Sequence, residues 1–275
     1  MEKVSIIIAT KNESKNIIRL LESIKKQTYS NIEIVVVDNH STDDTITLAS
    51  RYTPNVYTIG PERSAQRNYG VQKATGDFVL ILDGDMELTP SVVQECVSTF
   101  NAHINDVAGI TILEESMGTT FWAKCRILEK KLYSYDDNDF RAAARFYKKE
   151  LFEKIGGFNV DLVSGEDWDL SQRAQGFGKL YTIKSVTYHY DGDLPLIKSM
   201  KKKFYYGRHI DKYLAISSNK DFSDKQMSIV GRYKVFLSQP KILFANPVVG
   251  VGVLFLKTCE FGALGFGYLF QKLKS

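Results

Sequence analysis

The chain has 275 residues, of which 44% are hydrophobic and 25% are charged, and this composition is typical of a globular protein rather than a disordered one. A chain of this length can bury a substantial core, either as one large domain or as one domain with an appendage. The formal net charge of +4 is too small to indicate nucleic acid as a partner.

The cysteines and the start of the chain bear on its location. Cys96, Cys125 and Cys259 are odd in number, lie far apart and lack the spacing of metal ligands, so we expect a reducing, cytosolic environment. The first residues run directly into the apolar segment 4–8 without the pattern of a cleavable leader, so we expect no secretory signal.

The N-terminal part of the chain alternates apolar runs, which predict buried strands, with amphipathic spacing, which predicts helices. The predicted elements are a strand at 4–9, a helix at 17–24, a strand at 32–37, a helix whose cap and first-turn acids are 41–44, a strand at 56–59, a helix at 65–74, a strand at 78–82 and a helix starting near Pro90. This order indicates an α/β fold with a doubly wound, mostly parallel sheet flanked by helices.

Polar residues follow three of the predicted strands. These clusters are Thr10-Lys11-Asn12-Glu13, Asp38-Asn39 and Asp83-Gly84-Asp85. Because such sheets bind ligands at the carboxyl ends of their strands, we expect the clusters to form one site. Paired carboxylates suit a hard divalent cation that can hold a diphosphate, whereas Asp83-Gly84-Asp85 taken alone is also compatible with a simple turn. No Gly-x-Gly-x-x-Gly or Walker lysine loop accompanies these clusters, so a dehydrogenase-type dinucleotide site is not indicated.

Two later features have both a structural and a functional interpretation. The acids of Ser164-Gly165-Glu166-Asp167-Trp168-Asp169-Leu170 either stabilise the first turn of a helix or surround a ligand that the Gly165 backbone and the Trp168 ring approach. His189 lies among tyrosines and is either structural or an additional metal or phosphate contact.

The C-terminal part combines basic and apolar segments. The segment Lys198–Arg208 surrounds aromatic residues with lysines, which is typical of a solvated helix face or of a membrane interface. The apolar stretches 242–256 and 261–270 each fall short of the roughly 20 residues that a spanning helix requires. We expect this part to associate with a membrane, either through it or on it, and deletion after Ser238 to release the protein. A soluble helical cap is the alternative.

Six segments, taken in order, resemble glycosyltransferase family 2, whose members have the GT-A fold. They are 5–13, 37–45, 64–70, the Asp83-Gly84-Asp85 motif at the family's metal-binding D-x-D position, the segment 156–158, which resembles the family's acceptor-side segment, and 165–167, which resembles its catalytic acid motif. Asn39 stands where a second aspartate is common in the family. The resemblance extends over residues 3 to 210.

The resemblance implies a metal-dependent, inverting transfer of a sugar from a GDP- or UDP-sugar. The donor would contact strand-end and loop residues, namely Ala9, Thr10, Asn12, Glu13, Asp38, Asn39, Arg67, Asp83, Gly84 and Asp85. Asp85, with help from Asp83 and an additional contact from His189, would hold Mn²⁺ or Mg²⁺. Asp167 would be the general base, and Arg145, Glu166 and Trp168 would position the acceptor or sugar.

The expected organisation is a GT-A domain at 1–210, with a donor half at 1–115 and an acceptor half at 116–210, followed by a helical membrane-associating segment at 211–275. The resemblance implies a lipid-linked or glycan acceptor at the cytoplasmic face of the cell membrane. The alternatives are a polyprenyl-phosphate glycosyltransferase such as a mannosyltransferase, a sugar nucleotidyltransferase and a non-catalytic sugar-nucleotide binding module. Asp167 favours a hydroxyl acceptor, because a lipid phosphate is already ionised and needs no base.

Overall fold

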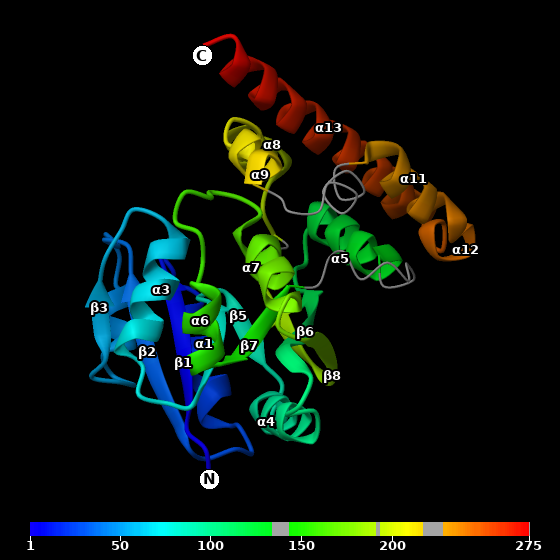
Figure 1. Cartoon of the computed structure of the whole chain (residues 1–275). Helices are drawn as coiled ribbons and strands as arrows, with labels where there is room; N and C mark the ends of the chain where they lie inside the picture. The colour runs from blue at the N-terminus through cyan, green and yellow to red at the C-terminus, as the bar shows by residue number, and fades with distance from the viewer. Residues whose placement is uncertain (134–142, 191–192, 217–227, 275) are drawn as a thin grey trace. The chain divides into compact units, whose positions relative to one another are not determined.

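The computed structural model describes residues 1–133, 143–190, 193–216 and 228–274. The chain forms two compact units, of which the first contains Met1–Glu114 and Ala142–Tyr188 and the second contains Glu115–Arg141 and His189–Ser275. Figure 1 shows an α/β first unit and a helical second unit. Among the described residues, 115–133, 189–190 and 193–210 group with the C-terminal helices, and the predicted boundary at 210 remains a prediction.

The first unit is built on an eight-stranded sheet with the order β3-β2-β1-β4-β7-β6-β8-β5. The strands are β1 (Val4–Thr10), β2 (Ile32–Asp38), β3 (Val56–Thr58), β4 (Phe78–Asp83), β5 (Met86–Leu88), β6 (Val107–Ser116), β7 (Ala144–Lys148) and β8 (Lys179–His189). β1 pairs in parallel with β2 and β4, and β2 pairs in parallel with β3. β7 is antiparallel to both β4 and β6. The predicted α/β fold is therefore confirmed.

Helices cover both faces of this sheet. They are α1 (Ile17–Lys25), α2 (Thr45–Ala49), α3 (Arg63–Lys73), α4 (Val92–Ala102), α6 (Lys149–Ile155) and α7 (Glu166–Gln175). Successive β1 side chains point to opposite faces, so Ile6 and Ile8 join the core formed with α1 and α4, whereas Ile7 joins the core formed with α3, α6 and α7. This burial on both faces explains why the central strands are apolar along almost their whole length.

One local prediction is confirmed only in part. Asp44 is the N-cap residue of α2, although its side chain makes no cap hydrogen bond, and α2 begins at Thr45 without an acidic residue in its first turn. Asp43 instead accepts hydrogen bonds from the Thr45 backbone N–H at 3.1 Å and from the Ser14 backbone N–H at 3.1 Å. The carboxylate therefore joins the loop after β2 to the loop after β1.

The regular elements of the second unit are helices in its described residues, apart from the last residues of β6 and β8. Its helices are α5 (Phe121–Tyr133), α8 (Leu196–Gly207), α9 (Ile210–Ile216), α11 (Ile229–Ser238), α12 (Pro240–Leu243) and α13 (Pro247–Lys272). The core between α5, α11, α12 and α13 consists of Cys125, Leu132, Phe236, Leu243, Val253 and Leu256. The two apolar stretches of the sequence thus belong mostly to one helix, α13, which is long and apolar enough to cross a membrane.

Candidate active site

The polar clusters that follow the central strands meet at one edge of the sheet. The register of the parallel pairs aligns Thr10 with Asp38 and Ala9 with Asp83. The carboxyl ends of β1, β2 and β4 therefore lie level, as the sequence predicted for a binding site at this edge.

Asp38 connects the loops after β1 and β2. Its carboxylate is fully buried and accepts a hydrogen bond from the Thr10 hydroxyl at 2.8 Å and another from the Ser41 backbone N–H at 2.7 Å. Asn12 supports the same junction, because its Oδ1 accepts from the Thr42 backbone N–H at 2.9 Å. The contacts of Asp38 and Asn12 with a nucleotide remain predictions, since both side chains here hold one loop against the other.

Two further residues, Asn39 and Gln66, donate hydrogen bonds to backbone carbonyls at this edge of the sheet. Asn39 is buried, and its backbone N–H donates to the Thr10 carbonyl at 2.9 Å. Gln66 of α3 is also buried, and its Nε2 donates to the carbonyls of Thr10 at 2.9 Å and Val37 at 2.7 Å. Sequence reasoning assigned no role to Gln66, although it directly precedes Arg67 in the same motif.

The Asp83-Gly84-Asp85 loop packs against the loop after β1. A Cβ atom at Gly84 would lie 2.9 Å from Glu13 Cγ and 3.1 Å from Thr10 Cγ2, so only glycine fits without a shift. Burial raises the pKa of Glu13, and the nearby charges of Asp85 and Asp83 raise it further. Negative charge is therefore concentrated where the two loops meet.

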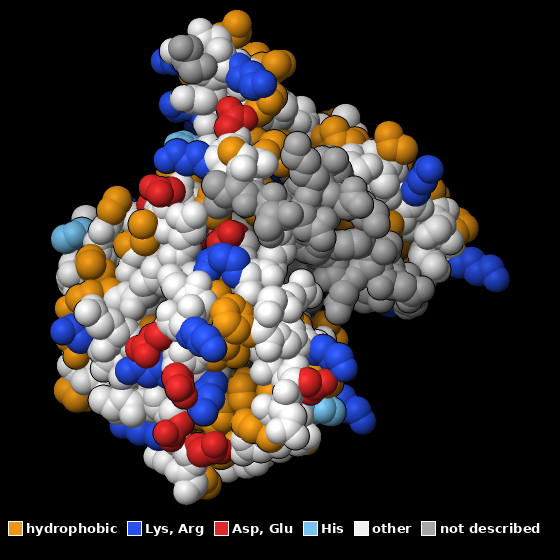
Figure 2. Space-filling model, in the orientation of Figure 1, with side chains coloured by type: hydrophobic (Ala, Val, Ile, Leu, Met, Phe, Trp, Pro, Cys, Tyr) orange, Lys and Arg blue, Asp and Glu red, His pale blue; other side chains and the backbone are white. Residues whose placement is uncertain are grey.

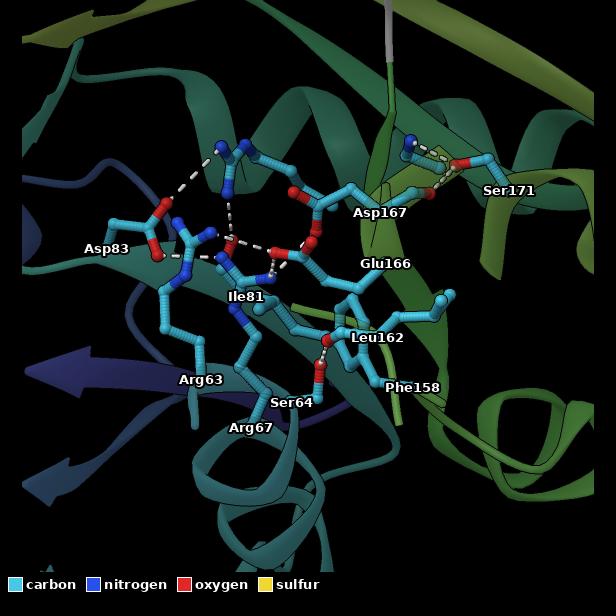
Figure 3. A network of polar contacts seen from close by, with 12 residues as sticks. Arg63, Ser64, Arg67, Ile81, Asp83, Phe158, Leu162, Glu166, Asp167 and Ser171 are labelled. Carbon is cyan, nitrogen blue, oxygen red and sulfur yellow. Dashed lines mark hydrogen bonds and ion pairs between the residues drawn. The ribbon is translucent and has the colours of Figure 1, made fainter. Parts of the chain in front are cut away.

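Arg67 of α3 joins this loop to the acids of the later segment (Figure 3). Its guanidinium is fully buried, with Nη2 2.7 Å from Asp83 Oδ1 and Nη1 2.7 Å from Asp167 Oδ1. The Phe158 ring lies 5.0 Å from the same guanidinium. The structure thus brings together Asp83 and Asp167, which are far apart in the sequence, through one buried cation.

A second arginine holds the other side of Asp83. Arg145 of β7 places Nη2 2.6 Å from Glu114 Oε1 and 3.6 Å from Asp83 Oδ2, while its Nη1 donates to the Ile81 carbonyl at 3.3 Å. Burial by itself raises the pKa of Asp83, but Arg67 and Arg145 hold that pKa well below its usual range. Sequence reasoning missed Glu114, and the expected contact of Arg145 with the acceptor or sugar remains a prediction.

The two adjacent acids at the start of α7 differ in access. Gly165 precedes them with a φ of 81°, which favours glycine and turns the chain into the helix. The Glu166 side chain is buried and lies 3.2 Å from Arg63 Nη2, and burial together with the charge of Asp167 raises the pKa of Glu166. The Asp167 side chain remains 33% exposed. Asp167 is therefore the acid of this pair that a substrate can reach, and the half-buried Trp168 follows it on α7.

Asn68 explains why the segment around Gly157 belongs to the same site. Its Nδ2 donates to the Phe158 carbonyl at 2.8 Å, and its Oδ1 accepts from the Phe158 backbone N–H at 2.8 Å. A Cβ atom at Gly157 would lie 2.7 Å from that Oδ1. This pair of bonds positions the Phe158 ring beside Arg67.

The carboxylates at this edge are of the kind that a hard divalent cation prefers. Asp85 is half-buried beside Glu13, and both supply carboxylate oxygens of the kind that Mg²⁺ and Mn²⁺ prefer. Asp83 is engaged by two arginines, and no group of three or more His, Cys, Asp or Glu side chains arranged as metal ligands occurs among the described residues. His189 ends β8 and falls in the second compact unit, so its contact with a metal remains a prediction.

Comparisons with known proteins agree with this architecture. The sequence profile described as "Glycosyl transferase family 2" matches residues 5–157. The chain is 30% identical over 199 residues to the uncharacterized glycosyltransferase YwdF of Bacillus subtilis. This alignment covers 67% of this chain and 71% of YwdF.

Solved structures share the fold at low sequence identity. The mannosyltransferase PcManGT from Pyrobaculum calidifontis, in complex with GDP-Man and Mn²⁺, is similar with a TM-score of 0.67 at 16% identity, over 98% of this chain and 88% of that one. Residues 1–349 of S. aureus TarS, in complex with UDP-GlcNAc, are similar with a TM-score of 0.54 at 17% identity, over 99% of this chain and 92% of that one.

Proposed function

The chain belongs to glycosyltransferase family 2, and from this membership we propose that it transfers a sugar, with inversion, from a nucleoside-diphosphate sugar to a hydroxyl of a lipid-linked or glycan acceptor. The observation that carries the proposal is the Arg67 guanidinium, which holds Asp83 of the predicted metal loop and the predicted base Asp167 at 2.7 Å each. One buried cation thereby fixes the distance between the donor side and the acceptor side.

The donor binds at the carboxyl ends of β1, β2 and β4. Support comes from the level strand ends and from two proteins of the same fold whose structures contain GDP-Man with Mn²⁺ and UDP-GlcNAc. Asp85 and Glu13 would hold Mn²⁺ or Mg²⁺, and the cation would supply positive charge that stabilises the leaving nucleoside diphosphate.

Asp167 accepts the proton of the acceptor hydroxyl while that oxygen attacks the anomeric carbon. The bond from the anomeric carbon to the diphosphate oxygen breaks in the same displacement, which inverts the carbon. The greater exposure of Asp167 supports this assignment over Glu166, which is buried against Arg63 and Arg67. Arg67 keeps the Asp167 carboxylate oriented, and Arg145 keeps Asp83 in place.

The acceptor is presented at the cytoplasmic face of a membrane. The lysine-rich helix α8 and the apolar helix α13 support this part of the proposal. Anionic headgroups attract the exposed lysines, and exposed apolar side chains enter the interface.

Release of nucleoside diphosphate from a panel of UDP- and GDP-sugars, with Mn²⁺, with Mg²⁺ and with chelator, tests the proposed function. We expect metal-dependent release with one donor, stimulated by a glycan or lipid-linked acceptor. No release from any donor with any metal, while one sugar nucleotide still binds, would instead support a non-catalytic binding module.

The variant Asp167→Asn tests the base. We expect kcat to fall by about 10² to 10⁴, as for loss of a general base, while the Kd of the donor stays within about twofold. Glu166→Gln is the matched control at the neighbouring position, because it leaves the Asp167 carboxylate in place. Unchanged turnover of Asp167→Asn with polyprenyl phosphate as acceptor would contradict a hydroxyl acceptor and favour the polyprenyl-phosphate transferase.

A further inference from the structure

Helix α13 has two opposite faces. The buried face packs inside the second unit and consists of Gly250, Gly252, Val253, Leu256, Lys257, Glu260 and Gly267. The exposed face, called here the outer stripe, consists of Val248, Val251, Phe255, Thr258, Gly262, Phe266, Leu269 and Leu273. The members of the outer stripe recur every three or four residues, which is the spacing of one side of a helix. Figure 2 shows hydrophobic side chains at the surface over this helix.

The charged residues in the middle of α13 belong to the buried face. Lys257 Nζ lies 2.8 Å from Glu129 Oε1 of α5 and 2.7 Å from Glu260 Oε2. The Ser199 hydroxyl of α8 donates to Glu260 Oε1 at 2.5 Å. The middle of α13 therefore differs from a helix on a soluble surface, because its ionic side chains Lys257 and Glu260 are buried while its exposed face is almost entirely apolar.

Helices α13 and α8 pack backbone against backbone at two glycines, so separating them would require both helices to repack. A Cβ atom at Gly267 would lie 2.2 Å from the Phe204 carbonyl oxygen, and one at Gly207 would lie 2.0 Å from the Leu264 carbonyl oxygen. α8 carries the exposed side chains Lys198, Lys201 and Lys202. Any movement of α13 into a bilayer therefore takes these lysines with it.

We propose that α13 lies in the plane of an anionic membrane, with its outer stripe in the hydrocarbon of one leaflet, and does not span the bilayer. This inference rests on the membrane association in the proposed function. A spanning α13 would carry the lysines of α8 and the Lys257–Glu260 pair into the bilayer interior, where charged groups are costly. An in-plane helix leaves all of them on the water side.

Charge at the two ends of α13 fits the same orientation. Lys241 is exposed just before the helix, and Lys272 and Lys274 are exposed at its end. Long cationic side chains at the ends of an interfacial helix extend to anionic headgroups while their stems stay in the apolar layer.

An apolar hollow widens the stripe at its N-terminal end. A cavity of about 540 Å³ is lined by Phe121 and Trp122 of α5 together with the first turns of α13, including Val248, Val251 and Phe255. Because these three α13 residues also belong to the outer stripe, the hollow and the stripe form one apolar surface. A hydrocarbon chain, rather than a hydrogen-bonding ligand, matches such a lining.

Labelling from one side of the membrane tests the orientation. Ala245→Cys and Lys274→Cys place a thiol at an exposed position beside either end of α13, each in a Cys259→Ala background of the full chain. Sealed inside-out membrane vesicles from expressing cells, whose outer surface is the cytoplasmic face, are treated with an impermeant maleimide before and after detergent. We expect both thiols to react equally before detergent, whereas reaction of only one of them until detergent is added would overturn the proposal.

The outer stripe is tested with the double variant Phe255→Glu/Phe266→Glu, whose two positions are 54% and 65% exposed. We expect partitioning to phosphatidylglycerol-containing vesicles to weaken by at least about tenfold, because two phenyl groups no longer enter the hydrocarbon. The matched control is Ile104→Glu/Val160→Glu in the first unit, at 54% and 55% exposure, which should bind as the unaltered chain does.

Three outcomes would overturn the inference. They are equal binding of the stripe variant, recovery of the unaltered chain in the supernatant with every vesicle composition, and a lipid-free dimer that the stripe variant abolishes. Nucleoside diphosphate release is measured on the same preparations. Loss of release with retained in-plane binding would contradict the proposed function alone.

Discussion

At the scale of single residues, Arg67 is the side chain on which the site depends most. A guanidinium presents its donors in a rigid fork, so it can bond Asp83 and Asp167 at the same time, and it does so fully buried. Such a cation is stable only while its carboxylates remain, because an unpaired buried charge is strongly destabilising. Arg67 is therefore both a structural and a positioning residue.

We predict that Arg67→Lys lowers kcat by at least about 100-fold and destabilises the fold by about 3–5 kcal/mol, because one ammonium cannot replace the fork. Turnover and thermal unfolding are the measurements. The control is Arg63→Lys, since the Arg63 side chain is 41% exposed and its contact with Glu166 is longer, at 3.2 Å. Equal effects of the two substitutions would argue against the bridging role.

At the scale of elements, the loops that follow β1 and β4 pack directly against each other. Gly84 lets the second loop lie directly on Glu13 and Thr10. The Asp43 carboxylate in the loop after β2 accepts from the Ser14 backbone N–H in the loop after β1 and from the Thr45 backbone N–H at the start of α2. The sequence predicted these loops as a site because each follows an apolar run. It could not predict the contacts between them, since these depend on the register of three strands.

Gly84→Ala should weaken Mn²⁺-dependent donor binding by about tenfold, because overpacking at this contact costs about 1–3 kcal/mol. Calorimetric titration with the donor measures the change. Gly265→Ala is the control, since nothing lies within 4 Å of the position of its added Cβ. Donor binding by Gly84→Ala equal to that of the control would show that the two loops do not need this close approach.

In the proposed site, the raised pKa of Glu13 would make metal binding depend on pH. Because the pKa of Glu13 is raised above its ordinary 4.5, Glu13 takes up its proton earlier than an exposed glutamate as the pH falls. Its charge is unfavourable to the fold at neutral pH, and that penalty disappears as the pH falls through the raised pKa. Asp83 stays ionised throughout, since its pKa is well below 3.8.

We therefore expect Mn²⁺ affinity to decline as the pH falls from neutral towards 4.5, at higher pH than an ordinary glutamate would require. Glu13→Gln should bind Mn²⁺ more weakly at neutral pH and lose this decline. Electron paramagnetic resonance of free Mn²⁺ measures both. If the Mn²⁺ affinity of Glu13→Gln fell with pH by the same amount and with the same midpoint, the pH dependence would belong to another group.

At the scale of the whole molecule, the C-terminal helices are part of a core and not a detachable tail. Leu243, Val253 and Leu256 pack with Cys125, Leu132 and Phe236. The expectation that deletion after Ser238 simply releases the protein from membranes therefore needs revision, because the deletion also removes half of this core.

We predict that a chain truncated after Ser238 aggregates or binds a hydrophobic dye, because Cys125, Leu132 and Phe236 lose their partners. Size-exclusion chromatography and dye fluorescence measure this. The full-length Phe255→Glu/Phe266→Glu chain is the control that keeps the core intact. A monodisperse truncated chain without dye binding would show that this core is dispensable.

Spacing of neighbouring residues was enough to predict the α/β class, the three polar strand ends and the order of the elements through α4, apart from the short strand β5, which no pattern indicated. Packing between distant segments was needed to see that Arg67 joins Asp83 to Asp167, that Glu114 holds Arg145, and that Lys257 and Glu260 of α13 are buried. The physical reason is distance along the chain. Local periodicity predicts which face of an element is apolar, but the partner of a buried charge is chosen by packing between segments as far apart as 100 residues.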